Sequence, residues 1–215
     1  LYPFLSLPDD CSGIREMETA GHISPRALVK AQTKIAEKQG ARVVKATVTG
    51  IDVQSTHVSV TTDDGQILES ERVLVATGGY TSAMKLLPRP LAMTVYARTV
   101  LLIRVTGPVA AALQTMPTII DRYADSYILP PIRYLDGHLY VKIGRGTEAD
   151  ARLESINELT DWFKSEGSER DRLSLAEAFE RLVPVLKECP DRHMDTCVTT
   201  FSKSGLPYID YVAGG

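Results

Sequence analysis

The chain has 215 residues, of which 44% are hydrophobic and 24% are charged, so it can bury a core, and disordered and collagen-like classes are excluded. Its net charge of -3 gives no electrostatic reason to expect a nucleic acid or an anionic membrane as a partner. The longest apolar run, Val100 to Val105, is interrupted by Arg104 and is much shorter than the roughly 18 residues that a membrane-spanning helix needs.

The first element expected along the chain is a helix that ends at Gly40, because glycine commonly stops helices. Ser24 is placed to cap the first turn, and Pro25 is tolerated there because its missing N–H would have no partner in a helix anyway. Three apolar residues then recur on one face at helical spacing: Leu28, Ala31 and Ile35.

Three strands are expected after this helix. Residues 41–48 are apolar and β-branched enough for the first strand, and the alternation from His57 to Thr61 predicts the second. Asp63-Asp64-Gly65 is typical of a tight turn, which leads into the third strand, from Gln66 to Ser70. The second and third strands are therefore expected to form a hairpin.

A short continuous apolar run from Arg72 to Thr77 ends at Gly78-Gly79. This pattern is typical of a strand that is buried on both faces and ends in a close approach of the backbone. Pro88 and Pro90 then interrupt the chain, and they mark an expected crossing between two domains.

The second half of the chain is expected to combine strands and two helices. Four strands are predicted from alternating apolar residues, with a turn at residues 135–137: 96–105, 118–122, 126–129 and 138–143. The helices follow at about residues 151–165 and 174–188, and Pro184 is expected to kink or shorten the second. Further strands near residues 196–201 and 208–213 are expected to complete the chain.

The cysteine content favours a reducing, cytoplasmic compartment over secretion. Cys11, Cys189 and Cys197 form neither a C-x-x-C pair nor an even set for disulfides. The first eight residues have no basic segment before their apolar stretch, unlike a signal peptide. Because the chain starts without methionine and stops in Gly214-Gly215 directly after an apolar run, we expect it to be part of a longer protein.

The order of several segments carries more information than any one of them. Gly21-His22-Ile23-Ser24-Pro25 opens the first helix, and the hairpin and a run ending in Ala76-Thr77-Gly78-Gly79 follow it. Beyond Pro90 come a long strand and a Tyr-x-x-Pro segment that begins at Tyr127.

The same order continues with a Gly-x-Leu-Tyr-Val-Lys strand that ends at Lys142, two helices, and a Cys-x-x-Thr segment that starts at Cys197 and leads to Asp210. Together these segments resemble the middle of the D-amino-acid oxidase and sarcosine oxidase superfamily of FAD enzymes. The spacing from Cys197 to Asp210 is most similar to the monomeric sarcosine oxidase type.

The resemblance implies an α+β (mixed α/β) fold with a partial FAD/NAD(P)-binding-type domain and an antiparallel-sheet substrate domain with flanking helices. Residues 1–88 would form part of the FAD-binding domain, and residues 89–195 would form the substrate-binding domain. Residues 196–215 would return to the FAD-binding domain as truncated strands.

The resemblance also implies FAD as the cofactor. Four positions match residues that lie near the cofactor in the family: Val48, Thr77, Gly78 and Gly79. Cys197 matches the cysteine that carries the flavin through a thioether in the sarcosine oxidase type. A thiolate is a competent nucleophile when its pKa is lowered, but a small buried core cysteine would explain Cys197 equally well.

Two further residues match family positions on the substrate side. Lys142 matches the lysine that promotes reaction with oxygen, where a fixed positive charge stabilises developing negative charge. Tyr127 falls at or beside a tyrosine that lines the substrate cavity, and alignment through Pro130 or Pro131 moves this match by one residue. The alternatives are an ordinary exposed strand lysine and a strand aromatic at a sheet surface.

Either Arg133 or Arg98 is a candidate to bind a substrate carboxylate through its guanidinium fork, although isolated arginines are more commonly solvated or in modest surface ion pairs. Gly146 stands where the sarcosine oxidase pattern has a substrate-side histidine, which argues against sarcosine as the substrate. The four histidines show no metal-ligand spacing with the cysteines, so no metal site is expected.

The chain departs from the family pattern in having no G-x-G-x-x-G motif, which normally holds the cofactor pyrophosphate at a helix N-terminus. The expected function is FAD-dependent oxidation of the C–N bond of a small-molecule amine or amino acid, with molecular oxygen or another electron acceptor. The alternative is a non-catalytic fragment, or an assembly or regulatory subunit, that retains the oxidase architecture. The sequence does not indicate an oligomeric state.

Overall fold

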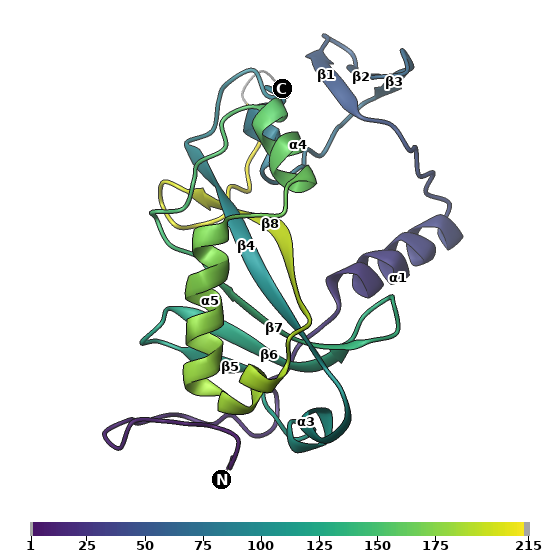
Figure 1. The fold of residues 1–215 in the computed structure, drawn as a ribbon. Helices are drawn as coiled ribbons and strands as arrows, with labels where there is room; N and C mark the ends of the chain where they lie inside the picture. Colours follow the sequence, from purple (N-terminus) through teal and green to yellow (C-terminus); the bar gives the residue numbers. More distant parts are fainter. Residues whose placement is uncertain (1, 213–215) are drawn as a thin grey trace. The chain divides into compact units, whose positions relative to one another are not determined.

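A computed structural model describes residues 2–212, which form two compact units (Figure 1). Unit 1 comprises the residues up to His22 together with residues 96–151 and 160–198. Unit 2 comprises residues 23–95, residues 152–159 and the residues from Thr199 onward. Each unit therefore draws on segments that are far apart in the sequence.

Unit 1 contains most of a five-stranded sheet with the strand order β5-β6-β7-β4-β8. The strands are β4 (Met93–Val105), β5 (Ile119–Asp121), β6 (Ser126–Arg133), β7 (Leu139–Arg145) and β8 (Arg192–Ser202). β7 pairs antiparallel with both β4 and β6, and β5 pairs antiparallel with β6. The four strands predicted between residues 96 and 143 and the strand near residue 196 are confirmed, with moderately longer or shorter bounds.

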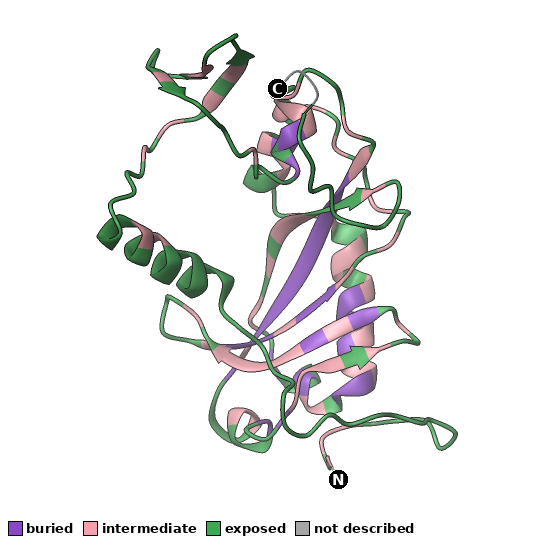
Figure 2. Ribbon diagram, turned by 180° about the vertical axis from the view of Figure 1, so that it is seen from behind, coloured by how far each residue is buried: buried purple, intermediate pink, exposed green. Residues whose placement is uncertain are grey.

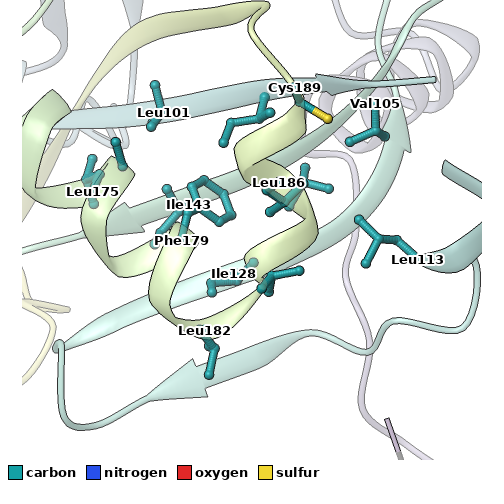
Figure 3. Close-up of a cluster of buried hydrophobic side chains, with 14 of the residues drawn as sticks. Leu101, Val105, Leu113, Ile128, Ile143, Leu175, Phe179, Leu182, Leu186 and Cys189 are labelled. Carbon is teal, nitrogen blue, oxygen red and sulfur yellow. The ribbon is translucent and has the colours of Figure 1, made fainter. Parts of the chain in front are cut away.

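The sheet of unit 1 has one apolar face, which helix α5 (Glu169–Leu182) covers (Figure 1). Because side chains alternate along a strand, every second residue of β4, β6 and β7 faces this helix. The fully buried side chains on the strands include Leu101, Ile103, Ile128, Val141 and Ile143. Figure 3 shows Leu175, Phe179 and Leu182 of α5 directed at these strands. This cluster is the core of unit 1.

The second predicted helix of this region ends where Pro184 requires. α5 stops at Leu182, and a short 3-10 helix, η1 (Pro184–Glu188), follows. Proline removes a backbone donor and clashes with the preceding turn, so the α-helical hydrogen bonds cannot continue through residue 184. The helix begins earlier than predicted, because the Ser168 hydroxyl caps it by accepting a hydrogen bond from the Asp171 N–H.

Helix α4 (Ile156–Lys164) is shorter than the predicted span of residues 151–165. Its start is set by a reciprocal pair of hydrogen bonds. The Glu158 N–H donates to Ser155 Oγ at 3.2 Å, and the Glu158 carboxylate accepts from the Ser155 N–H at 2.9 Å. This capping box fixes Ser155 as the residue before the first helical turn. A further short helix, α3 (Gly107–Ala112), was not predicted.

Unit 2 holds helix α1 (Pro25–Lys38) and a three-stranded antiparallel sheet of β1 (Val48–Val53), β2 (Val58–Thr62) and β3 (Ile67–Ser70). The predicted cap is present, since Ser24 Oγ accepts a hydrogen bond from the Ala27 N–H at 3.3 Å. The predicted hairpin of β2 and β3 is confirmed. A four-residue helix, α2 (Tyr80–Ala83), follows Gly79 and was not predicted.

Three predicted strands are wrong in whole or in part. Residues 41–47 form no strand, so β1 begins only at Val48; residues 208–212 form none either, and Ala213 lies outside the described residues. The predicted buried strand Arg72–Thr77 is neither paired nor buried, and Leu74 is 90% exposed. A strand needs a neighbour for its N–H and C=O groups, and among the described residues no strand pairs with this run.

The mixed α/β fold class is confirmed by two antiparallel sheets and five α-helices among the described residues. Burial is concentrated in β4, β7 and α5 of unit 1, whereas α1 is almost entirely exposed (Figure 2). None of the helices in the described part of the chain is long and apolar enough to cross a membrane.

Candidate functional site

The face of the unit 1 sheet opposite α5 carries two of the polar residues that the sequence singled out, Lys142 and Tyr127. In β7, Lys142 lies directly opposite Leu102 of β4 and Leu129 of β6. Tyr127 of β6 lies directly opposite Gly144 of β7. Directly opposite residues of an antiparallel pair point to the same side, so Lys142 and Tyr127 share the face that α5 leaves uncovered.

Lys142 and Tyr127 are neighbours on this face. The Lys142 Nζ lies 5.8 Å from the centroid of the Tyr127 ring, within the range of a cation–π contact. Both side chains are half-buried. A lysine in this position presents a positive charge at the surface of the sheet while its stem stays among the strands.

The Tyr127 phenol is held in its neutral form. Burial, and in smaller measure the charges of Cys197 and Tyr134, raise its pKa to about 12. At neutral pH the Tyr127 hydroxyl is therefore both a donor and an acceptor of hydrogen bonds, which suits it to orient a carboxylate or an amine.

Cys197 of β8 is a free, half-buried thiol in the same unit. Burial raises its pKa, whereas the positive charges of Lys142 and Arg98 lower it and the charge of Asp195 raises it. The Trp162 Nε1–H donates to the Cys197 carbonyl at 2.9 Å and so fixes the backbone beside the thiol. Two cations that favour the thiolate are thus opposed by the loss of water around the sulfur.

Arg98 of β4 is locked in a buried ion pair. Its Nη1 donates to the Asp150 carboxylate and to the Thr147 carbonyl, the latter at 2.8 Å. The Arg98 side chain is 5% exposed and that of Asp150 is 8% exposed. Thr147 Oγ1 donates to the second oxygen of Asp150 at 2.9 Å. The Arg98 guanidinium is therefore committed to Asp150 rather than presented to a substrate carboxylate.

The Arg98 guanidinium also fills the space beside Gly146. A Cβ added at position 146 would lie 2.8 Å from Arg98 Cζ and 3.0 Å from Arg98 Nε. Real Cβ atoms essentially never come this close, so any side chain at this position would displace Arg98. The Arg98 guanidinium thus occupies the space that a histidine at position 146 would need.

Arg133 lies elsewhere on the unit. It is exposed at the end of β6 opposite Leu139, and its Nη1 donates to the Gly137 carbonyl of the adjoining turn at 2.5 Å. Its remaining N–H groups stay available for another acceptor. The structure does not bring Arg133 into contact with Lys142 or Tyr127.

The predicted cofactor residues of the first half of the chain lie in unit 2. Val48 is half-buried at the start of β1, whereas Thr77, Gly78 and Gly79 lead into α2. The Thr77 and Thr81 hydroxyl oxygens are 2.8 Å apart.

The two glycines before α2 differ. Gly78 has a φ of +53°, and its Cβ position faces open space. A Cβ at Gly79 would meet Val95 Cγ1 at 3.3 Å and Thr200 Oγ1 at 3.2 Å. Gly78 therefore presents open backbone, whereas Gly79 packs against the interior of unit 2.

Sequence reasoning missed Asp150, Trp162 and Gly144. The Thr147-x-x-Asp150 spacing is the only local signal for Asp150, because a threonine hydroxyl can donate to a carboxylate three residues later. Its partner Arg98 lies 52 residues earlier, so the pairing itself has no local sequence signature. Among residues 2–212, no group of three or more His, Cys, Asp or Glu side chains is arranged to hold a metal ion.

Comparisons with known proteins agree on one family and one fold. A family model described as FAD dependent oxidoreductase matches residues 1–215. NikD, an amino acid oxidase essential for nikkomycin biosynthesis, is similar with 22% identity and a TM-score of 0.65, over 85% of this chain and 46% of that one.

Two further enzymes are also similar in structure. The fructosyl peptide oxidase from E. terrenum has 14% identity and a TM-score of 0.67, over 85% of this chain and 45% of its own. The deglycating fructosamine oxidase (Amadoriase II) from Aspergillus fumigatus has 16% identity and a TM-score of 0.63, over 82% of this chain and 43% of its own. The chain thus spans less than half the length of these structures. No curated protein matches the sequence.

Proposed function

Because the chain belongs to the FAD dependent oxidoreductase family, we propose that the protein containing it oxidises the C–N bond of an amine or amino acid. The observation that carries the proposal is the grouping of Lys142, Tyr127 and Cys197 in unit 1, on and beside the sheet face that α5 leaves uncovered. The similar proteins named as amino acid, fructosyl peptide and fructosamine oxidases all act on substrates of this chemical class.

FAD is the cofactor of the family, and the described side chains of unit 1 have the chemistry to lie against a flavin ring. An ammonium group, a neutral phenol and a thiol gather in unit 1, and Gly78 offers open backbone in unit 2. The sequence has no G-x-G-x-x-G motif to hold the pyrophosphate. When bound, FAD would supply the redox chemistry by accepting a hydride from the substrate.

Lys142 is proposed as the catalytic residue. Its ammonium group would place a fixed positive charge where negative charge develops on molecular oxygen or another electron acceptor. Electrostatic stabilisation of this kind needs a charge that is already in position, and the strand pairing of β7 with β4 and β6 supplies that rigidity.

Cys197 is proposed as the attachment point for the flavin, together with Val48, Thr77, Gly78 and Gly79 as cofactor-binding residues. Attachment needs the thiolate, which the charges of Lys142 and Arg98 favour. A purely structural role for Cys197 as a half-buried core residue is the alternative, and a mass measurement on the intact protein separates the two.

Tyr127 is proposed to bind the substrate through its hydroxyl. Arg133 remains the candidate for a substrate carboxylate, since its guanidinium is exposed whereas that of Arg98 is paired with Asp150. The filling of the Gly146 position by Arg98 supports a substrate other than sarcosine. We propose residues 89–195 as the substrate-binding domain, with residues 1–88 and 196–215 as parts of the FAD-binding domain.

A reducing compartment, the cytoplasm, is proposed for the protein. Cys11, Cys189 and Cys197 are all free, and the exposed Cys11 would be prone to oxidation elsewhere. A small-molecule amine and an electron acceptor are the proposed partners. The match of the family model to every residue of the chain supports this enzyme over a non-catalytic assembly or regulatory subunit.

The test is to purify the full-length protein, release its flavin by denaturation, and follow flavin bleaching with a panel of secondary amines and amino acids. We expect bound flavin and bleaching by at least one substrate class. The Lys142→Met variant should bleach normally but reoxidise slowly in oxygen, whereas Lys203→Met, at an exposed lysine, should behave like the wild type. A colourless protein that releases no flavin would overturn the proposal.

A further inference from the structure

The Tyr127 ring lies directly on the backbone of Gly144. A Cβ added at Gly144 would lie 2.5 Å from Tyr127 Oη, 2.7 Å from Cζ and 2.8 Å from Cε1. All three distances are shorter than real Cβ atoms adopt, and all three atoms belong to the far part of the ring. The phenol can occupy its observed place only because residue 144 has no side chain.

The contact joins neighbouring strands at a single point. Tyr127 of β6 and Gly144 of β7 are directly opposite each other, and a ring that covers a cross-strand glycine is a recognised way to pack such a gap. Gly144 itself is buried. The Tyr127 ring therefore reaches across β7 and toward Lys142, which is two residues from Gly144 on the same face.

We propose that Gly144 is a positioning residue that lets the Tyr127 ring lie beside Lys142 with its hydroxyl over residue 144, and thereby influences which substrates the site accepts. The inference rests on the proposed function, which assigns Tyr127 to the substrate. Gly144 touches no reacting group itself and acts only through Tyr127.

A methyl group at residue 144 has a defined effect on the ring. The ring must move away from residue 144, and on its other side the residue directly opposite Tyr127, Ile120 of β5, is 62% exposed. The ring can therefore yield without a clash against a packed core. The Tyr127 hydroxyl then leaves its place over residue 144 while the strands keep their pairing.

Gly146, directly after the end of β7, provides a matched control. It lies two residues from Gly144, and a Cβ there would meet the Arg98 guanidinium instead of Tyr127. Gly50 of β1 provides a second control, because its Cβ position faces open space. The three glycine-to-alanine variants add the same methyl group with three different neighbours.

The first arm of the test needs no catalytic activity. The intact protein is labelled with 3-fluorotyrosine, and the ¹⁹F resonance of Tyr127 is assigned by its loss in Tyr127→Phe. We expect Gly144→Ala to shift this resonance, and Gly146→Ala and Gly50→Ala to leave it in place. An unmoved resonance in Gly144→Ala, or an equal shift in Gly146→Ala, would overturn the proposal.

The second arm is kinetic. Gly144→Ala should raise KM for the amine about 2–10-fold, the range expected when one oriented hydrogen bond is lost, and should change kcat less. Tyr127→Phe should do the same, and the double variant should match Tyr127→Phe alone, since the hydroxyl is already absent. Additive effects on KM would overturn the proposal. Gly50→Ala should keep the wild-type KM.

Two further observations distinguish a wrong role for Gly144 from a wrong proposed function and from misfolding of the variant. If the wild-type protein oxidises no amine, the proposed function fails, and the ¹⁹F shift alone decides whether Gly144 places Tyr127. If Gly144→Ala is insoluble, Tyr127→Ala is combined with it, because removing the ring removes the clash. Recovery of soluble protein supports the proposal, and failure to recover it counts against it.

Discussion

The buried ion pair between Arg98 and Asp150 makes a prediction whose size follows from its burial. Asp150→Ala removes the carboxylate but leaves the Arg98 guanidinium, which is 5% exposed, in the interior. Breaking a buried pair by removing one partner costs about 3–5 kcal/mol, because the remaining charge has lost both its partner and its water. We expect Asp150→Ala to lower the free energy of unfolding by this amount.

A graded series separates the charge from the hydrogen bonds. Asp150→Asn retains one oxygen, which can accept from Arg98 or from Thr147 Oγ1 but not from both, because these two donors bind different oxygens of Asp150. It keeps part of the hydrogen bonding and should cost less than Asp150→Ala, about 1–3 kcal/mol. The double variant Arg98→Met/Asp150→Leu removes both charges and should be more stable than Asp150→Ala alone, since no buried charge is left unpaired.

The assay is urea unfolding of the intact protein, followed by circular dichroism and by Trp162 fluorescence. Glu169→Ala is the control, because it breaks an ion pair with Arg172 in which the glutamate side chain is 64% exposed, and it should have no measurable effect. If Asp150→Ala unfolds at the same urea concentration as the wild type, the argument that this pair is desolvated is wrong.

Three further predictions follow from single side chains. Leu175→Ala should lower the free energy of unfolding by about 2–5 kcal/mol, because Leu175 is fully buried. Leu173→Ala on the same helix, at a residue that is 57% exposed, should lower it by under about 1 kcal/mol. Urea unfolding of both variants checks this. In protein without attached flavin, where Cys197 is a free thiol, its alkylation by iodoacetamide should accelerate as pH rises toward its raised pKa. It should be slower in Lys142→Met, which removes a charge that lowers that pKa; equal rates by mass spectrometry in the two proteins would refute this. The pKa of Tyr127 is about 12 in the folded protein, whereas that of an unfolded tyrosine is about 10. The stability of the wild type relative to Tyr127→Phe should therefore be constant below pH 10 and should fall as pH rises from 10 to 12. Urea unfolding of both proteins at each pH measures this difference.

The elements that the sequence predicted correctly are those that local patterns determine. Helix α1 follows from Ser24 and the spacing of its apolar residues, and the end of α5 follows from Pro184. The strands of unit 1 follow from their alternation, because one face of that sheet is packed under α5. In each case the sequence pattern lies within the element that it predicts.

The wrong strand at Arg72–Thr77 has a different origin. Its apolar run satisfies the propensity for a strand, but a strand also needs partners, and no residue within the run specifies them. The candidate site shows the same division. Lys142, Tyr127 and Cys197 were selected by resemblance to a family, whereas Asp150 and Gly144 owe their roles to contacts across strands that only the folded chain displays.

Alternate residues of β7 face opposite sides of the sheet, so substitutions along this strand should affect either stability or activity. Val141 and Ile143 point into the core under α5, whereas Lys142 and Gly144 face the other side. In a mutational scan of this strand, substitutions at the two core positions should mainly reduce protein abundance, and substitutions at Lys142 should mainly reduce activity at unchanged abundance. A library meant to alter the substrate range can therefore vary the facing residues of β6 and β4 while the core-facing half of β7 is held fixed as the scaffold.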